Sequence, residues 1–171
     1  CRPRRRRCGP DQTRTGPFEP VSLKPLKPVK KAYVYMVRRQ HLLVHEHVDY
    51  PDMPLALPGG TLEPGELPPL AAWRESVEET GLDGGFGNLR LIGTDVQVHP
   101  KHRLKMDRWF YLSFPRRPLP ASWTSWEMDP SDWHEPVRIR WFWLPLSRLP
   151  ERSWTRVLQR HMRRHGLAPG G

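Results

Sequence analysis

Three glutamates at helical spacing are the residues of this chain best suited to bind a divalent cation. Glu75, Glu78 and Glu79 stand at positions i, i+3 and i+4, which places their carboxylates on one side of a helix. Like charges at this spacing repel, so each pair destabilises the helix by roughly a few tenths of a kcal/mol. Arg74 can bridge to Glu78, but one arginine does not neutralise three glutamates. A hard cation such as Mg²⁺, which shares its ligands between carboxylates and substrate phosphates, would do so.

The residues around these glutamates decide between a cation site and a solvated acidic helix face, which is the commoner reason for three glutamates alone. The chain from Gly60 to Leu82 reads GTLEPGELPPLAAWRESVEETGL. Its glycines let the backbone come close to an ion or a phosphate. Pro68 suits the first turn of a helix and Gly81 its left-handed end, so a helix is predicted over 68–80.

This segment resembles the Nudix box, written G-x5-E-x7-R-E-U-x-E-E-x-G-U, where U is an aliphatic residue. All seven fixed residues match, and from average residue usage a chance match in the chain is on the order of one in a million. Ser76 is the one departure, because an aliphatic residue is usual at its position. We expect looser packing behind the helix at Ser76, with the chemistry retained.

The resemblance implies a role for each matching residue. The implied metal ligands are the carbonyl of Gly59 and the carboxylates of Glu75, Glu78 and Glu79. The implied catalytic residues of the box are Glu78, Glu79 and Arg74. Arg74 would hold the glutamates through ion pairs. The implied structural residues are Gly60, Gly81 and Glu66, the partner of Arg74. The implied cofactor is Mg²⁺, with Mn²⁺ as a substitute, and the implied reaction is attack of water on a phosphorus of a nucleoside diphosphate linked to a group X.

The general base is predicted less directly. In the family it is a glutamate of the box or an acid on a loop before the last core strand. Glu135 precedes the strand-like residues 137–142 and is our first choice as a base or extra metal ligand. Glu127, Asp129 and Asp132 are alternatives in the same segment, which is otherwise an ordinary acidic loop.

Several residues are predicted to contact the substrate. Trp123, Trp126 and Trp133 fall in one segment, and an aromatic side chain stacks on a nucleobase for roughly 1–3 kcal/mol, although tryptophan more often serves packing. Cations in basic segments could meet phosphates, with an exposed basic turn as the alternative. The predicted substrate-binding residues are Arg38, Lys101, Arg103 and Trp126. Nothing in the sequence identifies the base or the group X.

Alternating strands and helices must position these residues. Strands are predicted over 32–38, 41–48, 55–57, 89–98, 106–114 and 137–144, and helices over 68–80 and 153–165. Residues 115–136 are predicted to be a long loop, and Leu70, Trp73 and Val77 are predicted to pack the first helix on the sheet. This pattern and the resemblance predict an α/β fold, a Nudix-like α/β/α sandwich with a mixed central sheet.

The net charge of +10 over 171 residues belongs to the ends of the chain. Residues 1–30 carry a net +7 and repeated prolines, and residues 148–165 carry +5. We therefore predict a basic, disordered or extended tail over 1–30, a catalytic domain over 31–165 and a flexible end over 166–171. Cys1 and Cys8 lie in the tail and are expected to be free thiols. No apolar run is long enough to span a bilayer, so a cytoplasmic protein without a membrane partner is expected.

Three functions compete. The first is hydrolysis of a small nucleotide, namely a nucleoside di- or triphosphate, a nucleotide sugar or a dinucleoside polyphosphate. The second is removal of pyrophosphate from RNA 5′ ends, suggested by the basic ends of the chain. The third is a catalytically silent binding module, which would have no reason to tolerate the repulsion among three glutamates. Isomerisation of isoprenoid diphosphates is a remote further possibility, and the oligomeric state is open, a homodimer included.

Overall fold

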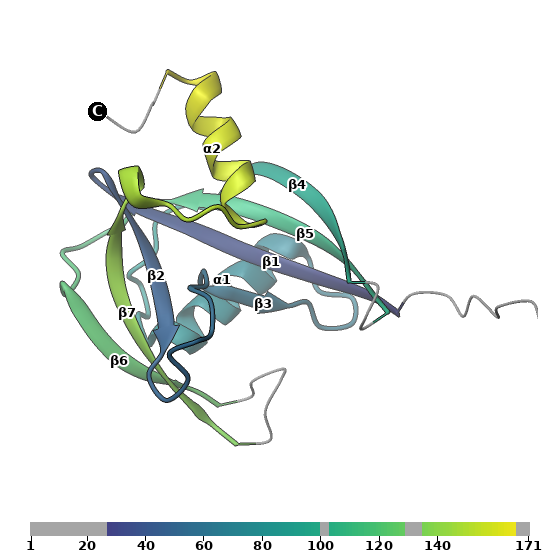
Figure 1. Ribbon diagram of the computed structural model, residues 1–171, viewed down its shortest axis with the longest axis horizontal. Coiled ribbons are helices and arrows are strands. Elements are labelled where there is room, and N and C mark those ends of the chain that lie inside the picture. Colours follow the sequence, from purple (N-terminus) through teal and green to yellow (C-terminus); the bar gives the residue numbers. More distant parts are fainter. Residues whose placement is uncertain (1–26, 100–102, 129–134, 167–171) are drawn as a thin grey trace, which may run out of the picture.

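The computed structural model describes residues 27–99, 103–128 and 135–166 (Figure 1). Their elements are β1 (Lys27–Arg38), β2 (His41–His47), β3 (Gly59–Thr61), α1 (Pro68–Thr80), β4 (Arg90–His99), β5 (Leu104–Ser113), β6 (Ser122–Glu127), β7 (Val137–Pro145), the short 3-10 helix η2 (Leu146–Arg148) and α2 (Thr155–Arg164). Some residues singled out in the sequence lie outside the described ranges: Cys1, Cys8, Lys101, Asp129, Asp132 and Trp133. No helix of the described ranges is both long and apolar enough to cross a membrane.

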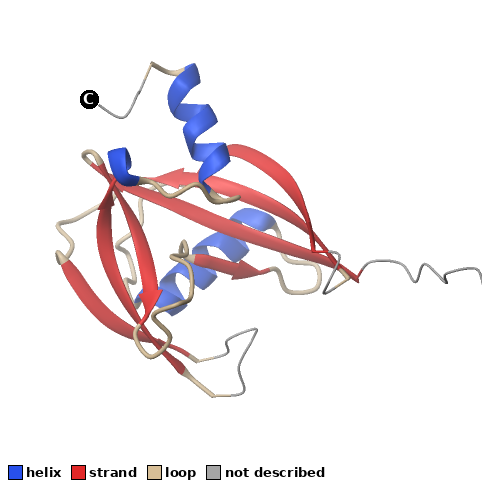
Figure 2. Ribbon diagram, in the orientation of Figure 1, coloured by secondary structure: helices blue, strands red, loops and turns tan. Residues whose placement is uncertain are grey.

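A seven-stranded mixed sheet forms the centre of the molecule. Its strands lie in the order β4-β5-β1-β2-β7-β6, with β3 paired to β1. The β1–β5 pair is parallel and the other pairs are antiparallel. The two α-helices lie on either side of the sheet (Figure 2), which confirms the predicted α/β/α sandwich with a mixed central sheet.

Strand β1 is buried on both faces because its side chains alternate between two cores. Ala32, Val34 and Met36 pack with Ala71 and Ala72 of α1 in one hydrophobic cluster. On the opposite face, Tyr35 packs with Val157, Leu158 and Met162 of α2 in a second cluster. This central strand therefore fixes the position of both helices and of β3, which carries Gly59 and Gly60.

Helix α1 spans the predicted residues but presents a different face to the sheet. Leu70 and Trp73 are exposed, whereas Ala71, Ala72 and Ser76 are buried. The prediction for Leu70 and Trp73 was therefore wrong. Small side chains face the sheet here because α1 lies close against β1 and β3, where larger ones would not fit.

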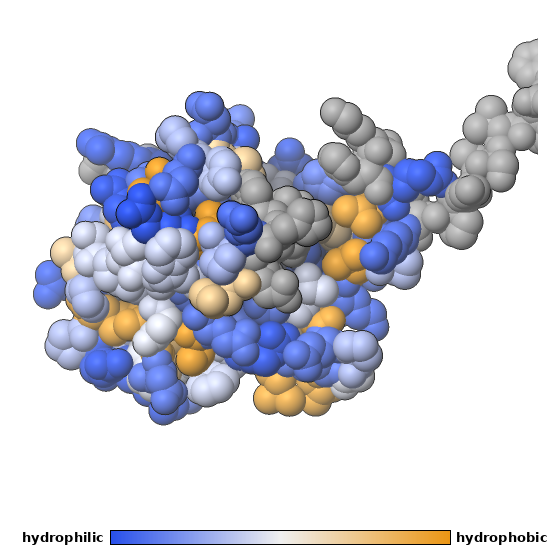
Figure 3. Space-filling view, turned by 90° about the horizontal axis from the view of Figure 1, so that it is seen from below, coloured by the Kyte–Doolittle hydropathy of each residue, from blue (hydrophilic) through white to orange (hydrophobic). Residues whose placement is uncertain are grey.

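The segment predicted as a loop over 115–136 contains strand β6, which pairs antiparallel with β7. Strand β1 begins at Lys27, ahead of the predicted start at Ala32. The predicted strand over 55–57 is reduced to a single bridge between Ala56 and His45. On the face drawn in Figure 3, hydrophilic surface surrounds separate apolar patches.

Candidate metal and catalytic site

Helix α1 carries the three glutamates and has well-defined ends. It starts with Pro68 and Pro69 after Leu67, where their missing N–H groups cost nothing. It ends at Gly81, whose φ of 69° is left-handed and whose N–H donates to the carbonyl of Val77 at 2.8 Å. This confirms the predicted helix and its glycine stop.

Two of the three carboxylates converge on the glycine pair at the start of β3. The backbone N–H of Gly59 donates to Oε2 of Glu79 at 3.0 Å. Gly60 lies under Glu75, since a Cβ added at Gly60 would come within 2.5 Å of Cδ of Glu75. A side chain at Gly60 would therefore displace that carboxylate. The requirement for glycine here is steric, because the carboxylate and the backbone approach each other closely.

Burial gives this carboxylate pair unusual acidities. Loss of hydration raises the pKa of Glu79 well above its ordinary value. The hydrogen bond from the Gly59 N–H lowers this pKa, whereas the negative charges of Glu127 and Glu75 raise it. Loss of hydration also raises the pKa of Glu75, with Arg74 opposing the shift. Both shifts arise first from burial, which disfavours the charged form of each carboxylate.

Arg74 organises the acidic side of the site. It donates from Nε and Nη2 to the two carboxylate oxygens of Glu66 at 2.9 and 2.8 Å. Its Nη1 lies 3.1 Å from Oε1 of Glu75 and 3.4 Å from Oε2 of Glu78. The hydrogen bonds from Arg74 and from the Glu63 N–H hold the pKa of Glu66 down at about 2. Arg74 and Glu66 thus form the pair that the resemblance implies.

The residues present fit a hard divalent cation. The donors around Gly59 and Gly60 are carboxylate and carbonyl oxygens, which Mg²⁺ and Mn²⁺ prefer, and a cation would compensate for the hydration that Glu75 and Glu79 lose on burial. The third carboxylate is placed differently, because the side chain of Glu78 is 61% exposed and turned toward Arg74. Within the described ranges, no three acidic, histidine or cysteine side chains stand close enough to bind an ion without rearrangement.

A cavity of about 470 Å³ opens beside Glu79. Glu127 of β6 lines it together with Glu79, and Oε2 of Glu127 lies 4.0 Å from Nε2 of His47. Strand β6 is tied to α1 at this point, because Oγ of Ser125 donates to the carbonyl of Glu79 at 2.5 Å and Nε1 of Trp123 donates to that of Thr80 at 2.9 Å. The strand missed in the sequence therefore carries an acid into the site.

Other residues of this cavity were not singled out from the sequence as site residues. They are Lys31, Tyr33, His45, His47, Gln97, His99, Arg152, Ser153 and Trp154. Residues from β1, β2, β4 and the segment before α2 meet only in the folded sheet. The alternation of His45 and His47 on one strand face was the only signal available, and both side chains are buried.

The remaining predicted site residues lie away from this cavity. Glu135 is exposed and is not among the described residues lining the cavity. Trp126 is 54% exposed and alternates with Ser125 and Glu127, so it faces the other side of β6. Arg103 is exposed in a turn with a φ of 51°. Arg38 lines a different cavity, where its guanidinium lies 4.0 Å above the ring of Trp143.

Comparisons with known proteins agree with this architecture. The NUDIX domain family model matches residues 27–164. Diphosphoinositol polyphosphate phosphohydrolase 3-alpha of Homo sapiens is 39% identical over 101 residues, which cover 57% of this chain and 56% of that protein. Diphosphoinositol polyphosphate phosphohydrolase 3-beta of Mus musculus is 38% identical over 101 residues, which again cover 57% of this chain and 56% of that protein. The match thus spans only about half the length of these relatives.

Solved structures share the fold at low sequence identity. A MutT NUDIX hydrolase from Burkholderia pseudomallei superposes with a TM-score of 0.56 at 19% identity, over 79% of this chain and 98% of that one. A MutT protein from Methanosarcina mazei Go1 gives 0.57 at 18% identity, over 84% and 97%. These likenesses support the fold, while the family match covers the strands, the glycine loop and helix α1 together. The chain therefore belongs to the Nudix family of hydrolases.

Proposed function

We propose that this chain hydrolyses a phosphoanhydride bond in a nucleoside diphosphate linked to a group X, with Mg²⁺ as cofactor and Mn²⁺ as a substitute. One observation carries the proposal. The carboxylates of Glu75 and Glu79 converge on Gly59 and Gly60 at the wall of a cavity large enough for a small phosphorylated molecule. Nudix hydrolases generally use divalent metal ions, and the carboxylate oxygens of Glu75 and Glu79 are suitable ligands for such ions.

The residues of the site have different roles in the proposed reaction. Glu75, Glu78, Glu79 and the carbonyl of Gly59 would hold the cation, and Arg74 would orient the glutamates. When bound, the cation supplies positive charge to the phosphate oxygens and makes water a better nucleophile near neutral pH. Glu78 must turn from Arg74 toward the site, which its exposure permits. The burial of Glu79 strengthens its attraction for a cation, because little water competes with the ion.

We assign the general base to Glu127 in preference to Glu135. Glu127 lines the same cavity as Glu79 and its charge raises the pKa of Glu79, so the two carboxylates are near neighbours. Nε2 of His47, on β2, lies 4.0 Å from Oε2 of Glu127. A base must be within hydrogen-bond reach of the water it activates, and a carboxylate in the cavity wall satisfies this better than one on an exposed loop.

The rest of the cavity suits a nucleotide. Lys31 and Arg152 supply positive charge for phosphates. Burial raises the pKa of Tyr33 to about 12, so its hydroxyl stays protonated at neutral pH and can donate a hydrogen bond. Trp154 offers an aromatic surface for a base, and its Nε1 donates to the carbonyl of Leu55 at 3.1 Å, which holds the ring in place.

A diphosphoinositol polyphosphate is the second candidate substrate. It is favoured by the printed names of the relatives, which are diphosphoinositol polyphosphate phosphohydrolases. Such a densely charged substrate needs many cations around it. The described residues that line the cavity include one lysine, Lys31, and one arginine, Arg152. Burial keeps the side chain of His45 neutral. This composition favours the less charged nucleotide.

A Mg²⁺-dependent screen of the full chain tests the proposal. Its substrates are nucleoside di- and triphosphates, nucleotide sugars, dinucleoside polyphosphates, a diphosphoinositol polyphosphate and 5′-triphosphorylated RNA. We expect turnover of a nucleotide that stops with a chelator, with product analysis showing which phosphorus is attacked. Preferred turnover of the inositol substrate or of RNA would replace the nucleotide assignment. No Mg²⁺-dependent turnover of any phosphoanhydride would overturn the proposal and favour a silent binding module.

A further inference from the structure

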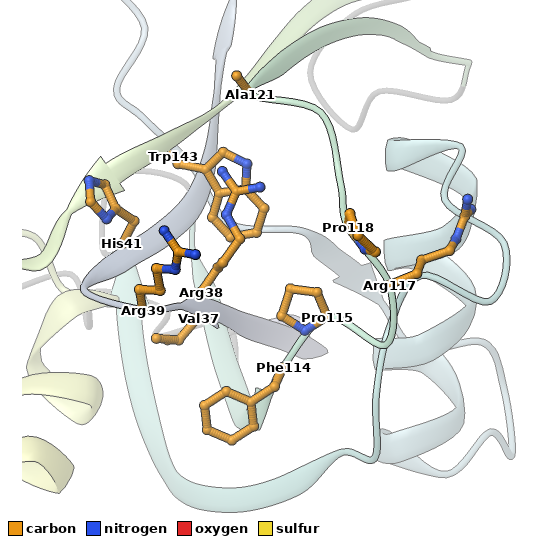
Figure 4. Close-up of a pocket in the computed structure, with 10 residues that line it drawn as sticks. All are labelled: Val37, Arg38, Arg39, His41, Phe114, Pro115, Arg117, Pro118, Ala121 and Trp143. Carbon is orange, nitrogen blue, oxygen red and sulfur yellow. The ribbon is translucent and has the colours of Figure 1, made fainter.

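A second cavity of about 780 Å³ lies at the C-terminal end of β1, away from the carboxylates, and Figure 4 shows residues that line it. Its walls come from the β1–β2 hairpin, the segment after β5 and strand β7. Tyr33 pairs with Gly59 at the first site, and Arg38 ends β1 roughly 16 Å further on, at about 3.3 Å per strand residue. No described residue lines both cavities. The two are therefore separate sites.

The walls of this second cavity are positively charged. Arg38, Arg39 and Arg117 line it with His41, and none of the described lining residues is acidic. Nη1 of Arg38 donates to the carbonyl of Leu119 at 2.9 Å. The side chain of Arg117 points away from Arg38 and Arg39 (Figure 4), and its Nη2 donates to the carbonyl of Asp83 at 3.3 Å. The Leu119 carbonyl orients the guanidinium of Arg38 without neutralising it. The cavity thus presents fixed positive charge to an anion.

Aromatic side chains stand beside these cations. The Arg38 guanidinium lies over the ring of Trp143, and Nε1 of Trp143 donates to the carbonyl of Pro120 at 2.9 Å, which holds the stack in place. Figure 4 shows Phe114 on a different part of the wall, and its side chain is 56% exposed. An exposed aromatic ring in a cationic cavity favours a ligand with both a planar ring and negative charge.

Arg39 occupies a backbone position that disfavours it. Arg38 pairs with His41, so Arg39 and Gln40 form a two-residue hairpin turn, and Arg39 has a φ of 54°. Glycine or asparagine usually fills such a position, because other side chains are strained there. An arginine held at this point keeps its charge at the cavity at some cost to the fold, as is common at binding sites.

We infer that this second cavity binds a nucleotide, with its phosphates on Arg38 and Arg39 and its base against Phe114. The ligand combines the two properties that the walls select, negative charge and a flat ring. Its place on the sheet, away from Glu75 and Glu79, makes it an additional binding site and not part of the hydrolytic one. The inference holds whether or not the substrate at the carboxylates is a nucleotide.

Equilibrium dialysis tests this with an adenosine triphosphate analogue that carries methylene groups in place of its bridging oxygens. The full chain with Mg²⁺ is compared with the double variant Arg38→Gln/Arg39→Gly and with Phe114→Ala. The glycine removes the charge of residue 39 and relieves its strained backbone, so Arg39→Gly alone should raise the Tm while weakening binding. Arg140→Gln is the matched control, because Arg140 is an exposed arginine of the same sheet, paired with Glu46 and outside the cavity.

We expect the wild-type chain to bind one more equivalent of the analogue than the double variant, and Arg140→Gln to bind as the wild type does. Each lost arginine should weaken this equivalent by roughly tenfold, the usual effect of one charged hydrogen bond. Equal binding by wild type and double variant would overturn the inference. So would an equal loss in Arg140→Gln, which indicates general charge attraction. Inorganic triphosphate binding as tightly as the analogue, with Phe114→Ala unchanged, would overturn the assignment to a nucleotide.

Discussion

Arg74 and Glu66 form a bidentate ion pair, in which Nε and Nη2 of Arg74 donate to Oε1 and Oε2 of Glu66 at 2.9 and 2.8 Å. The same guanidinium reaches Glu75 and Glu78 through Nη1. The planar fork therefore holds the loop before α1 and two glutamates of the helix in one arrangement. A lysine would carry the charge but could not make these parallel hydrogen bonds.

Arg74→Lys should lower kcat by roughly a hundredfold while the protein stays folded, because small displacements of catalytic groups cost about that much. Steady-state kinetics and circular dichroism would measure the two effects. Arg140→Lys is the control, since Arg140 pairs with Glu46 at 2.7 Å on the exposed surface. Wild-type kcat in Arg74→Lys would show that charge alone is sufficient at this position.

Glu79→Gln should abolish Mg²⁺-dependent hydrolysis and leave the fold intact. The amide keeps the shape of the side chain but loses the charge that binds a cation. Because burial and the neighbouring Glu75 and Glu127 disfavour that charge, the variant should unfold at the same temperature as the wild type, or higher, in a chelator.

Thermal unfolding with and without Mg²⁺ separates this from general damage. A cation that binds the folded state raises the Tm by mass action, so Mg²⁺ should stabilise the wild type and not Glu79→Gln. Glu78→Gln should lose activity in the same way. The exposed Glu151→Gln is the control and should behave as the wild type does. Wild-type turnover in Glu78→Gln or Glu79→Gln would disprove the metal assignment.

Glu127→Gln and Glu135→Gln form a matched pair that tests the general base. A general base contributes roughly 10²–10⁴-fold to the rate. We expect a loss in that range for Glu127→Gln, at unchanged Mg²⁺ stabilisation of the fold, and no loss for Glu135→Gln. The opposite result would return the role to Glu135, which the sequence favours because it precedes strand β7.

The contrast between these two acids shows what the sequence can predict about the site. The box is a local pattern, so the positions of Arg74, Glu75 and Glu79 along one helix follow from spacing alone. The meeting of Glu127 with Glu79 depends on β6 pairing with β7 and folding against α1. The side of β6 that faces the interior includes the polar Ser125. The strand therefore lacks the alternation of hydrophobic and polar residues that would have identified it in the sequence.

Helix α1 shows the same limit in the fold. Its ends follow from proline and glycine, and both were predicted correctly. Its buried face was not, because the large Leu70 and Trp73 are exposed while Ala71 and Ala72 meet the sheet. The sheet-facing side of α1 is set by how closely the helix approaches β1, which no property of the helix sequence specifies.

His45 should make the stability of the protein sensitive to acid. Its side chain packs 4.6 Å from the ring of Trp141, and burial lowers its pKa to about 3, with His47 adding to the shift. The unfolded chain, with a histidine pKa of about 6.5, binds a proton between pH 6.5 and 3 that the folded protein does not. The free energy of unfolding therefore falls as the pH drops through this window.

Between pH 6.5 and 5 this effect of His45 amounts to about 2 kcal/mol, at 1.36 kcal/mol per pH unit. Urea unfolding at pH 7 and pH 5 should show that His45→Phe, which keeps an aromatic ring beside Trp141, loses less stability on acidification than the wild type by about that amount. His41→Phe is the control, because His41 lies at the more exposed start of β2, and it should lose as much as the wild type. Equal losses in all three proteins would contradict a neutral His45 in the folded state.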